Sequence, residues 1–457
     1  MFSKETYKER RLKLASAMGS GILLFLGNDE QGLNYADNTF RYRQDSSFLY
    51  YFGISDAGLA AVIDVDNNST TIFGDELSID SIVWMGTLPT LHERAERVGV
   101  ADVKPAAQLA QVLAQAQEQG RKIHFLPPYR AEHQLKLMSL LGLLPAAQIA
   151  SVPFIRAIIE QRNHKTAEEI AEIERACDVT ADMHITAIRT VRPGLHEYDV
   201  VAEMLHVAHK ANCEESFATI ATINGQTLHN HYHGNLIKPG DLFLIDAGAE
   251  LPSGYCGDMS STVPADPKFT TRQREVYEIQ NAMHRASVAT LRPGIPYMEV
   301  YDISAIAMVD GLKGLGLMKG DAVEAVKQGA HALFYPHGLG HMMGLDVHDM
   351  ENFGERWVGY AGAEKSTQFG RKSQRLAIPL EEGFVFTVEP GIYFIPELID
   401  LWKSEKKFTD FINYDAVEAY RNFGGIRNEE DYLITPDGAR RLGKKIPLTP
   451  EEVEALR

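Results

Sequence analysis

Hydrophobic and polar positions in the first third of the chain alternate between helical and strand-like spacing. In chain order the pattern predicts a helix at 3–18, a strand at 21–27, strands at 59–65 and 70–73, a helix at 106–119 and a strand at 122–126. Asn67-Asn68 lies between the two adjacent strands, and this dipeptide favours a hairpin turn. Strands that alternate with helices indicate a small α/β domain, which we place at residues 1–157.

A second domain, which we place at residues 158–457, begins with an amphipathic helix. Thr166 and Glu169 have the spacing of a capping box, and Ile173 and Cys177 lie on one face of the segment behind it. A chain of 457 residues is long for a single domain, so a division into two suits its length.

The second domain contains an internal repeat. Met183-His184 and the run from Thr190 to Leu195 recur 100 positions later (283 − 183) as Met283-His284 and the run from Thr290 to Ile295. Each copy has the pattern of a helix, a stop at Arg-Pro-Gly and a new helix. A fixed offset through all three parts predicts a duplicated half-domain, although Arg-Pro-Gly is also a common helix stop by itself. A site between two such halves would take residues from both.

Composition and charge narrow the function classes. The formal net charge of −17 argues against nucleic acid, because a phosphate backbone requires a basic surface. The three cysteines have no paired spacing, which favours a reducing compartment over a disulfide framework. The apolar run 21–27 is too short for a membrane span and has no cleavage-like site after it. We therefore expect a cytoplasmic protein without a membrane or nucleic-acid partner.

Two aspartates stand close to an apolar strand pattern. Asp246 follows the buried-strand pattern 242–245, and Asp258 comes after a hairpin-like loop at 251–254. A hairpin brings the two carboxylates together, where they repel each other unless a proton or a cation lies between them. Taken singly, either aspartate has a simpler interpretation as an N-cap or a salt-bridge partner.

A glycine-rich loop carries three histidines, His337, His341 and His348. The glycines among them argue against a helix, so the segment is not the helical H-E-x-x-H zinc motif. A lone histidine is more often structural than a ligand, but three in one such loop favour a site.

Two glutamates complete the set. Glu389 follows the strand pattern 384–388, and Glu429 lies in a strand that we predict from 424 to 434. Arg427 lies two positions before Glu429 and on the same face of that strand, so an ion pair between them is the simpler interpretation.

Together these residues form an oxygen-rich set of possible metal ligands: Asp246, Asp258, His341, Glu389 and Glu429. One histidine and four carboxylates suit a hard or borderline divalent ion such as Mn²⁺. Four carboxylates exceed what one divalent ion needs for neutrality, so we predict two ions that share carboxylates. Such a pair lowers the pKa of a water molecule and polarises a carbonyl group.

These motifs resemble those of the pita-bread metallopeptidases, the group that contains methionine aminopeptidase, aminopeptidase P and prolidase. The similar segments of the second domain are 244–248, 337–341, 387–391 and 425–429. In the first domain, 42–53 and 84–86 resemble the non-catalytic domain of the Xaa-Pro peptidases. The resemblance implies an α+β fold: a pita-bread (creatinase/aminopeptidase) catalytic domain with pseudo-twofold duplicated halves, preceded by a smaller α/β domain.

The resemblance also implies how the ligands are shared. Asp246 would hold one metal alone, Asp258 and Glu429 would bridge both, and His341 and Glu389 would hold the other. Glu389 would in addition be the general base for the bridging water. The expected cofactor is a pair of Mn²⁺ ions, with Co²⁺ or Zn²⁺ as alternatives.

A histidine that precedes a tyrosine lines the substrate site in this family. His231 is our choice here, with His229 and His233 as alternatives. Two departures from the family pattern are eleven residues between the aspartates (247–257), where ten are usual, and Asn428 in place of an aliphatic residue. A hairpin loop can absorb the extra residue, and we expect Asn428 to face away from the neighbouring ligand.

Further roles follow from the same resemblance. His337 and His348 would contact the peptide or stabilise the tetrahedral oxyanion, and Arg427 would orient the bridging glutamate. Arg375 lies where prolidases carry an arginine that binds the free carboxylate of a dipeptide, and a guanidinium suits a carboxylate well. A solvated basic turn is the simpler interpretation of Arg375.

The separation of 40 positions between the two glutamates (429 − 389) favours prolidase, because aminopeptidase P usually has a much shorter gap. We therefore expect a Xaa-Pro dipeptidase that acts on short proline-containing peptides. The alternatives are a Xaa-Pro aminopeptidase that acts on longer peptides, or a non-catalytic binding protein on the same fold; a phosphotriesterase side activity at the same site is also compatible with the sequence. Trp84 belongs to a segment that in relatives lies near a neighbouring subunit's site, so a homodimer or larger homo-oligomer is expected.

Overall fold

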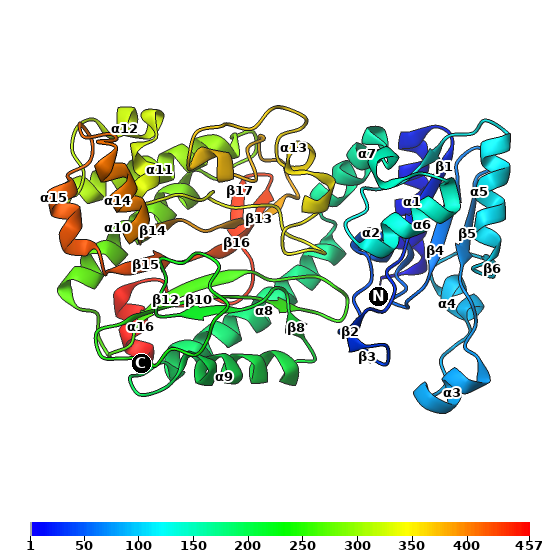
Figure 1. Cartoon of the computed structure of the whole chain (residues 1–457), viewed down its shortest axis with the longest axis horizontal. Helices are drawn as coiled ribbons and strands as arrows, with labels where there is room; N and C mark the ends of the chain where they lie inside the picture. The colour runs from blue at the N-terminus through cyan, green and yellow to red at the C-terminus, as the bar shows by residue number, and fades with distance from the viewer. Residues whose placement is uncertain (1) are drawn as a thin grey trace. The chain divides into compact units, whose positions relative to one another are not determined.

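The computed structural model describes residues 2–457, and the chain folds into two compact units (Figure 1). The N-terminal unit holds the chain up to Arg162 together with Asn352–Trp357, and the C-terminal unit holds Asn163–Glu351 and Val358–Arg457. The domain boundary at residue 157 stays a prediction, because compactness in the folded chain does not measure which segment folds by itself.

The N-terminal unit contains, in chain order, α1 (Lys4–Met18), β1 (Ile22–Leu26), β2 (Gly32–Tyr35), β3 (Asn38–Thr39), α2 (Ser46–Phe52), β4 (Ala60–Asp64), β5 (Ser69–Phe73), α3 (Ile79–Met85), α4 (Leu91–Arg97), β6 (Asp102–Lys104), α5 (Gln108–Glu118), β7 (Ile123–His124), α6 (Ala131–Leu141), the 3₁₀ turn η1 (Pro145–Ala147) and α7 (Val152–Asn163). Five strands form one sheet in the order β6-β5-β4-β1-β7. The predicted hairpin is confirmed, since β4 and β5 pair antiparallel and Asn68 in their turn has a left-handed φ of 49°.

Apolar residues of β1 pack on both faces of this sheet. Ile22 belongs to a buried cluster with Leu113 of α5. On the other face, Phe25 contacts Phe52 of α2 and Phe154 of α7, with ring centroids 5.4 and 5.3 Å apart. A strand that is buried on both faces has a continuous apolar run, which explains the uninterrupted pattern at 21–27.

After α7 the chain forms α8 (Ala167–Thr190), α9 (Glu197–Lys210), β8 (Glu214–Glu215), β9 (Ile220–Thr222), β10 (Leu242–Ala247), β11 (Ala249–Glu250), β12 (Met259–Pro264), α10 (Thr271–Thr290), α11 (Tyr297–Gly314), α12 (Ala322–Gln328), η2 (Ala330–Leu333), η3 (Glu351–Phe353), α13 (Glu355–Val358), η4 (Arg371–Ser373), β13 (Val385–Val388), β14 (Gly391–Phe394), α14 (Pro396–Ser404), α15 (Tyr414–Val417), η5 (Glu418–Tyr420), β15 (Gly424–Arg427), β16 (Glu430–Thr435), β17 (Gly438–Arg441) and α16 (Pro450–Leu456). Among the helices of residues 2–457, none combines the length and the apolar character that crossing a bilayer requires.

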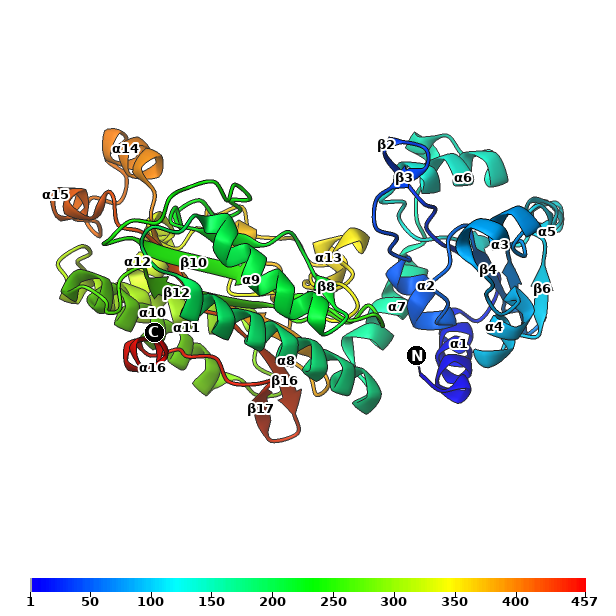
Figure 2. The same ribbon diagram turned by 90° about the horizontal axis from the view of Figure 1, so that it is seen from below.

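The repeat in the sequence corresponds to two equivalent helix pairs, α8–α9 and α10–α11 (Figure 2). The first helix of each pair ends at Thr190 or Thr290. Gly194 and Gly294 follow with φ values of 92° and 85°, a left-handed conformation that favours glycine. Each pair is followed by two strands that pair antiparallel, β10 with β12 and β13 with β16. The predicted duplication of a half-domain is therefore present in the fold.

The strand that we predicted from 424 to 434 is two strands, and this prediction was wrong in its continuity. β15 pairs with β14, whereas β16 pairs with β13. At the break, the backbone N–H of Glu429 donates to the carbonyl oxygen of Ser260 in β12 over 3.0 Å. The chain changes its hydrogen-bonding partner at this point. The hydrogen bond at the break connects β12 of the first half with the segment between β15 and β16 of the second half, beside the candidate site.

Candidate metal centre

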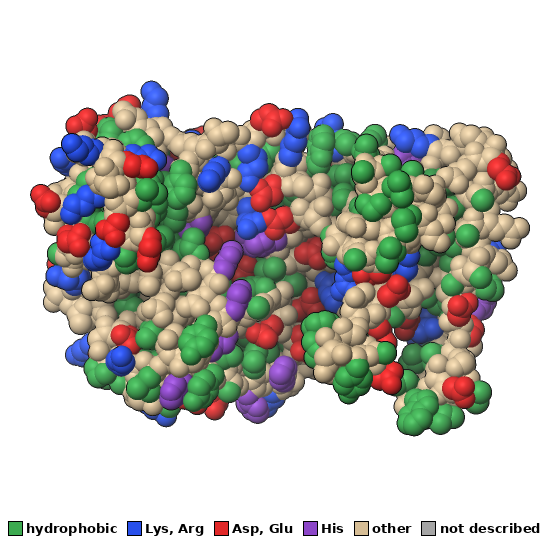
Figure 3. Space-filling model, viewed as in Figure 1, with side chains coloured by type: hydrophobic (Ala, Val, Ile, Leu, Met, Phe, Trp, Pro, Cys, Tyr) green, Lys and Arg blue, Asp and Glu red, His purple; other side chains and the backbone are tan. Residues whose placement is uncertain are grey.

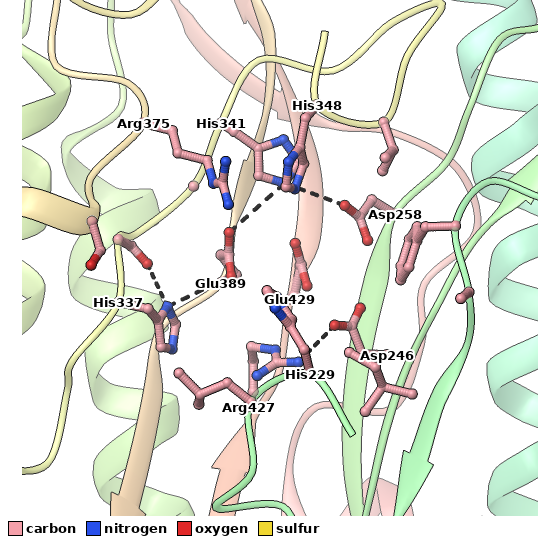
Figure 4. A pocket seen from close by; sticks show the side chains of 18 of the residues that line it. His229, Asp246, Asp258, His337, His341, His348, Arg375, Glu389, Arg427 and Glu429 are labelled. Carbon is pink, nitrogen blue, oxygen red and sulfur yellow. Dashed lines mark hydrogen bonds and ion pairs between the residues drawn. The ribbon is translucent and has the colours of Figure 1, made fainter. Parts of the chain in front are cut away.

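One cavity of about 530 Å³ in the C-terminal unit is lined by every residue predicted for the site. Figure 3 shows acidic and histidine side chains gathered in a hollow of this unit, and Figure 4 shows the labelled side chains converging from several elements. The predicted residues that line the cavity are Asp246, Asp258, His341, Glu389, Glu429, His231, His337, His348, Arg375 and Arg427.

A hairpin places the two aspartates at the same end of adjacent strands. Asp246 lies in β10 opposite Ser260, and Asp258 immediately precedes β12. Close packing between Gly248 and Gly257 fixes this end, because a Cβ atom on Gly248 would lie 1.9 Å from the carbonyl oxygen of Gly257. The hairpin therefore brings both carboxylates to the cavity, as the sequence predicted.

The histidine loop runs along β13, and Glu389 directly follows this strand. The backbone N–H of Thr387 donates to the carbonyl oxygen of His341 over 3.0 Å, and Gly340 lies so close that a Cβ there would be 2.0 Å from the carbonyl oxygen of Thr387. The Nδ1–H of His341 donates to the carbonyl oxygen of Met342 over 3.1 Å. This bond leaves the Nε2 lone pair of His341 for a metal ion, the arrangement that metal-binding histidines usually have.

Three buried side chains have the geometry of a metal site. Asp258, His341 and Glu429 each offer one ligand atom, and these atoms lie within 4.8 Å of one another. His341 Nε2 lies 3.4 Å from an oxygen of Asp258 and 3.8 Å from an oxygen of Glu389. Two carboxylates and an imidazole around one point suit a divalent cation.

Burial and mutual repulsion disfavour the ionised carboxylates of this site. Burial, followed by the charges of Glu429 and Asp246, holds the pKa of Asp258 well above its ordinary value. Burial and the charge of Glu389 do the same to Glu429, and burial raises the pKa of Glu389 to about 7. Carboxylates in such an environment need protons or cations for compensation, so the donor set fits divalent metal ions.

Arg427 lines the cavity beside Asp246, with which it forms an ion pair (Figure 4). Its guanidinium donates to Asp246 over 2.6 Å and to Ser260 Oγ over 2.9 Å. Ser260 in turn donates to Glu429 over 2.7 Å. The arginine thus reaches the glutamate through a serine, and the direct Arg427–Glu429 ion pair considered from the sequence is not the contact that the structure has.

Tyr393 links two predicted site residues and was missed by the sequence reasoning. Its hydroxyl accepts a hydrogen bond from Arg427 over 2.8 Å and donates to His337 Nε2 over 2.9 Å. Burial lowers the pKa of His337 to about 3, so this imidazole is neutral at pH 7. Tyr393 lies two positions after the end of the motif at 387–391, but nothing in the local pattern distinguishes it from a core tyrosine.

His348 lies above His341, with ring centroids 4.0 Å apart. Its Nδ1–H donates to Glu351 over 2.6 Å. Burial and the charge of Arg375 lower the pKa of His348 to about 4. Arg375 also lines the cavity and forms an ion pair with Glu351, so it is part of the site and not only a solvated turn.

The structure places two of the three candidate substrate histidines in the cavity. His229 and His231 both line it, whereas His233 donates from Nε2 to the carbonyl oxygen of Thr219 over 3.0 Å and is not among the lining residues. An apolar wall completes the cavity, formed by Phe217, Ala218, Ile220, Leu228 and Val347. No sequence pattern predicted this wall, because isolated apolar residues occur throughout any core.

Asn428 is buried and bonded. It donates to Gln280 over 2.6 Å and accepts from the backbone N–H of Thr262 over 3.0 Å. Asn428 stands where the family usually has an aliphatic residue, and its hydrogen bonds to Gln280 and Thr262 compensate for the burial of its polar amide.

The chain matches the family model of metallopeptidase family M24 over residues 171–436 and that of the aminopeptidase P N-terminal domain over residues 7–124. It is 32% identical to the Xaa-Pro aminopeptidase of Escherichia coli (strain K12), over 99% of this chain and 98% of that protein. It is 30% identical to the Xaa-Pro dipeptidase of Rattus norvegicus, over 98% of this chain and 91% of that protein. The solved structure of E. coli aminopeptidase P with the inhibitor Pro-Leu matches with a TM-score of 0.82 at 31% identity, over 100% of this chain and 98% of that one.

These matches confirm the predicted fold class, a pita-bread domain preceded by a smaller N-terminal domain. They also confirm that the chain is an enzyme of the metallopeptidase class, for which divalent metal ions are the cofactors. The chain belongs to metallopeptidase family M24 and carries the N-terminal domain of aminopeptidase P.

Proposed function

We propose that this chain is a Xaa-Pro dipeptidase with two divalent metal ions, Mn²⁺ being the expected metal. The observation that carries the proposal is the position of Arg375, which lines the same cavity as the candidate ligands (Figure 4). A cationic group at that place suits the free carboxylate of a dipeptide. The insertion between β14 and β15, which forms α14, α15 and η5, supports the same assignment because prolidases carry a helical insertion there.

Five side chains would hold the ions. Asp246 would bind one of them alone, Asp258 and Glu429 would bridge, and His341 and Glu389 would bind the other. When bound, such a pair lowers the pKa of a water molecule and polarises the scissile carbonyl.

The remaining residues would bind and orient the peptide. Glu389 would take the proton from the attacking water, and its carboxylate lines the cavity 3.8 Å from His341 and 3.7 Å from His337 (Figure 4). His348 donates its Nδ1–H to Glu351, so its neutral ring presents Nε2 as an acceptor for a substrate N–H. His337 and His231 would contact the peptide, and Arg427 would hold Asp246 and, through Ser260, Glu429.

Matched peptides test the proposal. In the presence of Mn²⁺, we expect Ala-Pro to be cleaved faster than Ala-Pro-Ala. Arg375→Met should raise KM for Ala-Pro about tenfold or more, because it removes the group that binds the carboxylate. Lys372→Met, which alters an exposed cation outside the cavity, is the matched control.

A Xaa-Pro aminopeptidase is the second candidate. The chain is as similar to the aminopeptidase of E. coli as it is to the rat dipeptidase, with 32% and 30% identity. Turnover of Ala-Pro-Ala without turnover of Ala-Pro would decide for the aminopeptidase.

We also propose a homodimer, on the basis of α3. No residue of this helix is buried, and Ile79, Val83, Trp84 and Met85 are 72%, 72%, 83% and 81% exposed. An apolar helix without a covered face marks an interaction surface. Sedimentation should give a dimer or larger species for the unmodified chain, and Trp84→Asp should shift it toward the monomer. A monomer for the unmodified chain would contradict this proposal.

A cytoplasmic location is proposed from the thiols. The thiols of Cys177, Cys213 and Cys256 are all buried, and three cysteines without paired spacing suit a reducing compartment. Detection of the chain in a cell fraction other than the cytoplasm would overturn it.

A further inference from the structure

The carboxylate of Glu351 contacts two of the groups to which we give a role in substrate binding. The Nδ1–H of His348 donates to its Oε2 over 2.6 Å, and the guanidinium of Arg375 forms an ion pair with its Oε1. The three side chains are similarly accessible, with 33% exposure for His348, 31% for Arg375 and 32% for Glu351. Because the contacts use different oxygens, one carboxylate holds both groups at once.

The backbone around Glu351 fixes this arrangement. The N–H of Glu351 donates to the carbonyl oxygen of His348 over 3.2 Å, which brings the two side chains together three positions apart. Asp349, between them, forms a buried ion pair with Lys165 over 2.9 Å. The loop therefore presents the Glu351 carboxylate at a defined place beside the cavity.

The charge of Glu351 opposes the function expected of Arg375. A peptide carboxylate that approaches Arg375 meets a cation whose charge is already offset by an anion in direct contact. A carboxylate at contact distance attracts a guanidinium, and a neighbouring charge of opposite sign cancels much of this attraction. A guanidinium has five N–H donors, so its remaining donors still orient a carboxylate.

We propose that Glu351 is a specificity-determining residue, which fixes Arg375 beside the cavity and offsets its charge. Peptides that have a free carboxylate on the proline and peptides that lack it are consequently accepted more evenly than Arg375 alone would permit. This inference rests on the proposed Xaa-Pro peptidase function and deepens it by naming what sets the preference between dipeptides and longer or capped substrates.

The test compares Ala-Pro with its amide, Ala-Pro-NH₂, in which an NH₂ group replaces one carboxylate oxygen and the C-terminus is neutral. Glu351→Gln keeps the size and an acceptor oxygen but removes the charge. KM for Ala-Pro should fall on the order of threefold to tenfold, while KM for the amide changes less than about twofold and kcat stays similar for both. Equal changes for the two substrates, or no change, would overturn the inference.

Three further variants separate electrostatics from loss of structure. Glu351→Asp keeps the charge and should keep the substrate ratio of the unmodified enzyme. In an Arg375→Met background, Glu351→Gln should no longer alter the ratio, because the charge that it offsets is gone. Glu174→Gln removes a carboxylate from a surface pair with Arg440, outside the cavity, and is the control.

The unmodified, metal-loaded enzyme is assayed first with both substrates. Hydrolysis of neither substrate overturns the proposed function and the role of Glu351 with it. Hydrolysis of one or both, with a ratio that Glu351→Gln leaves unchanged, overturns only the role of Glu351. If Glu351→Gln unfolds, the test is made with Glu351→Asp. A folded Glu351→Asp variant whose substrate ratio differs from that of the unmodified enzyme also counts against the role of Glu351.

Discussion

The buried ion pair between Lys165 and Asp349 supports the loop that carries the site histidines. Lys165 Nζ lies 2.9 Å from Asp349 Oδ2, and both side chains are 1% exposed. The pair joins segments 184 positions apart in the chain, since Lys165 immediately precedes the capping box of α8 and Asp349 directly follows His348. The N–H of Asp349 also donates to the carbonyl oxygen of Met342 over 2.9 Å, which closes the loop.

Lys165→Met keeps the aliphatic stem and removes the ammonium, so the buried carboxylate of Asp349 loses this counter-charge. Breaking a buried pair from one side costs about 3–5 kcal/mol. For a unit of this size, one kcal/mol corresponds to about 2–3 °C in melting temperature, so we expect the Tm of the metal-free protein to fall by roughly 6–15 °C at pH 8. Peptidase activity should fall as well, because the loop between His341 and His348 loosens.

Thermal melting followed by circular dichroism measures this loss at pH 8. Asp349→Asn in the Lys165→Met background should recover part of the loss, because no charge then remains buried.

Lys327→Met is the matched control, since Lys327 is 78% exposed and its pair with Glu324 spans 4.0 Å. An exposed pair of this kind contributes about 0–1 kcal/mol. A Lys165→Met protein that melts within 2 °C of the unmodified one at pH 8, as the control is expected to do, would show that the reasoning about this pair is wrong.

Three further predictions concern the cavity. Glu389→Ala should reduce kcat by about 10²-fold or more with an unchanged circular dichroism spectrum, and substantial residual activity in a folded, metal-loaded variant would refute its role as general base. In the metal-free protein, the raised pKa values of Asp258 and Glu429 mean that the folded state holds protons more tightly than the unfolded one. The stability from these groups is present at low pH and is lost as the pH rises through the raised values, so Tm in EDTA should fall from pH 5 to pH 8, and Asp258→Asn should flatten that slope. Tyr393→Phe removes a buried acceptor of Arg427, which costs about 1–3 kcal/mol, and should lower kcat/KM about tenfold or more with little change in metal content; unchanged kinetics would contradict the link through Tyr393.

The local pattern of hydrophobic and polar residues was sufficient to predict many of the helices, strands and turns. The capping box at Thr166 is present in α8, and the strand before Asp246 and the turn before Asp258 occur where the pattern placed them. Each of these features depends on neighbours in the chain, such as a side chain that caps its own helix or a turn between adjacent strands. The prediction of one continuous strand through Glu429 was wrong for the opposite reason. At the break the backbone N–H of Glu429 bonds to Ser260, which is far away in the sequence.

The contacts that order the site could not be found in this way. Arg427 meets Ser260 across 167 positions, and Tyr393 joins His337 across 56. Serine, tyrosine and glutamate are common on any surface or in any core, so their residue type carries no signal until the chain has folded. The sequence alone therefore determined which residue types are candidate ligands, their order and the duplication, because these follow from local periodicity and motif spacing. Only the tertiary structure decided that Arg427 reaches Glu429 through Ser260 and that Glu351 holds both His348 and Arg375, because these contacts depend on how the strands and the intervening loops pack around one cavity.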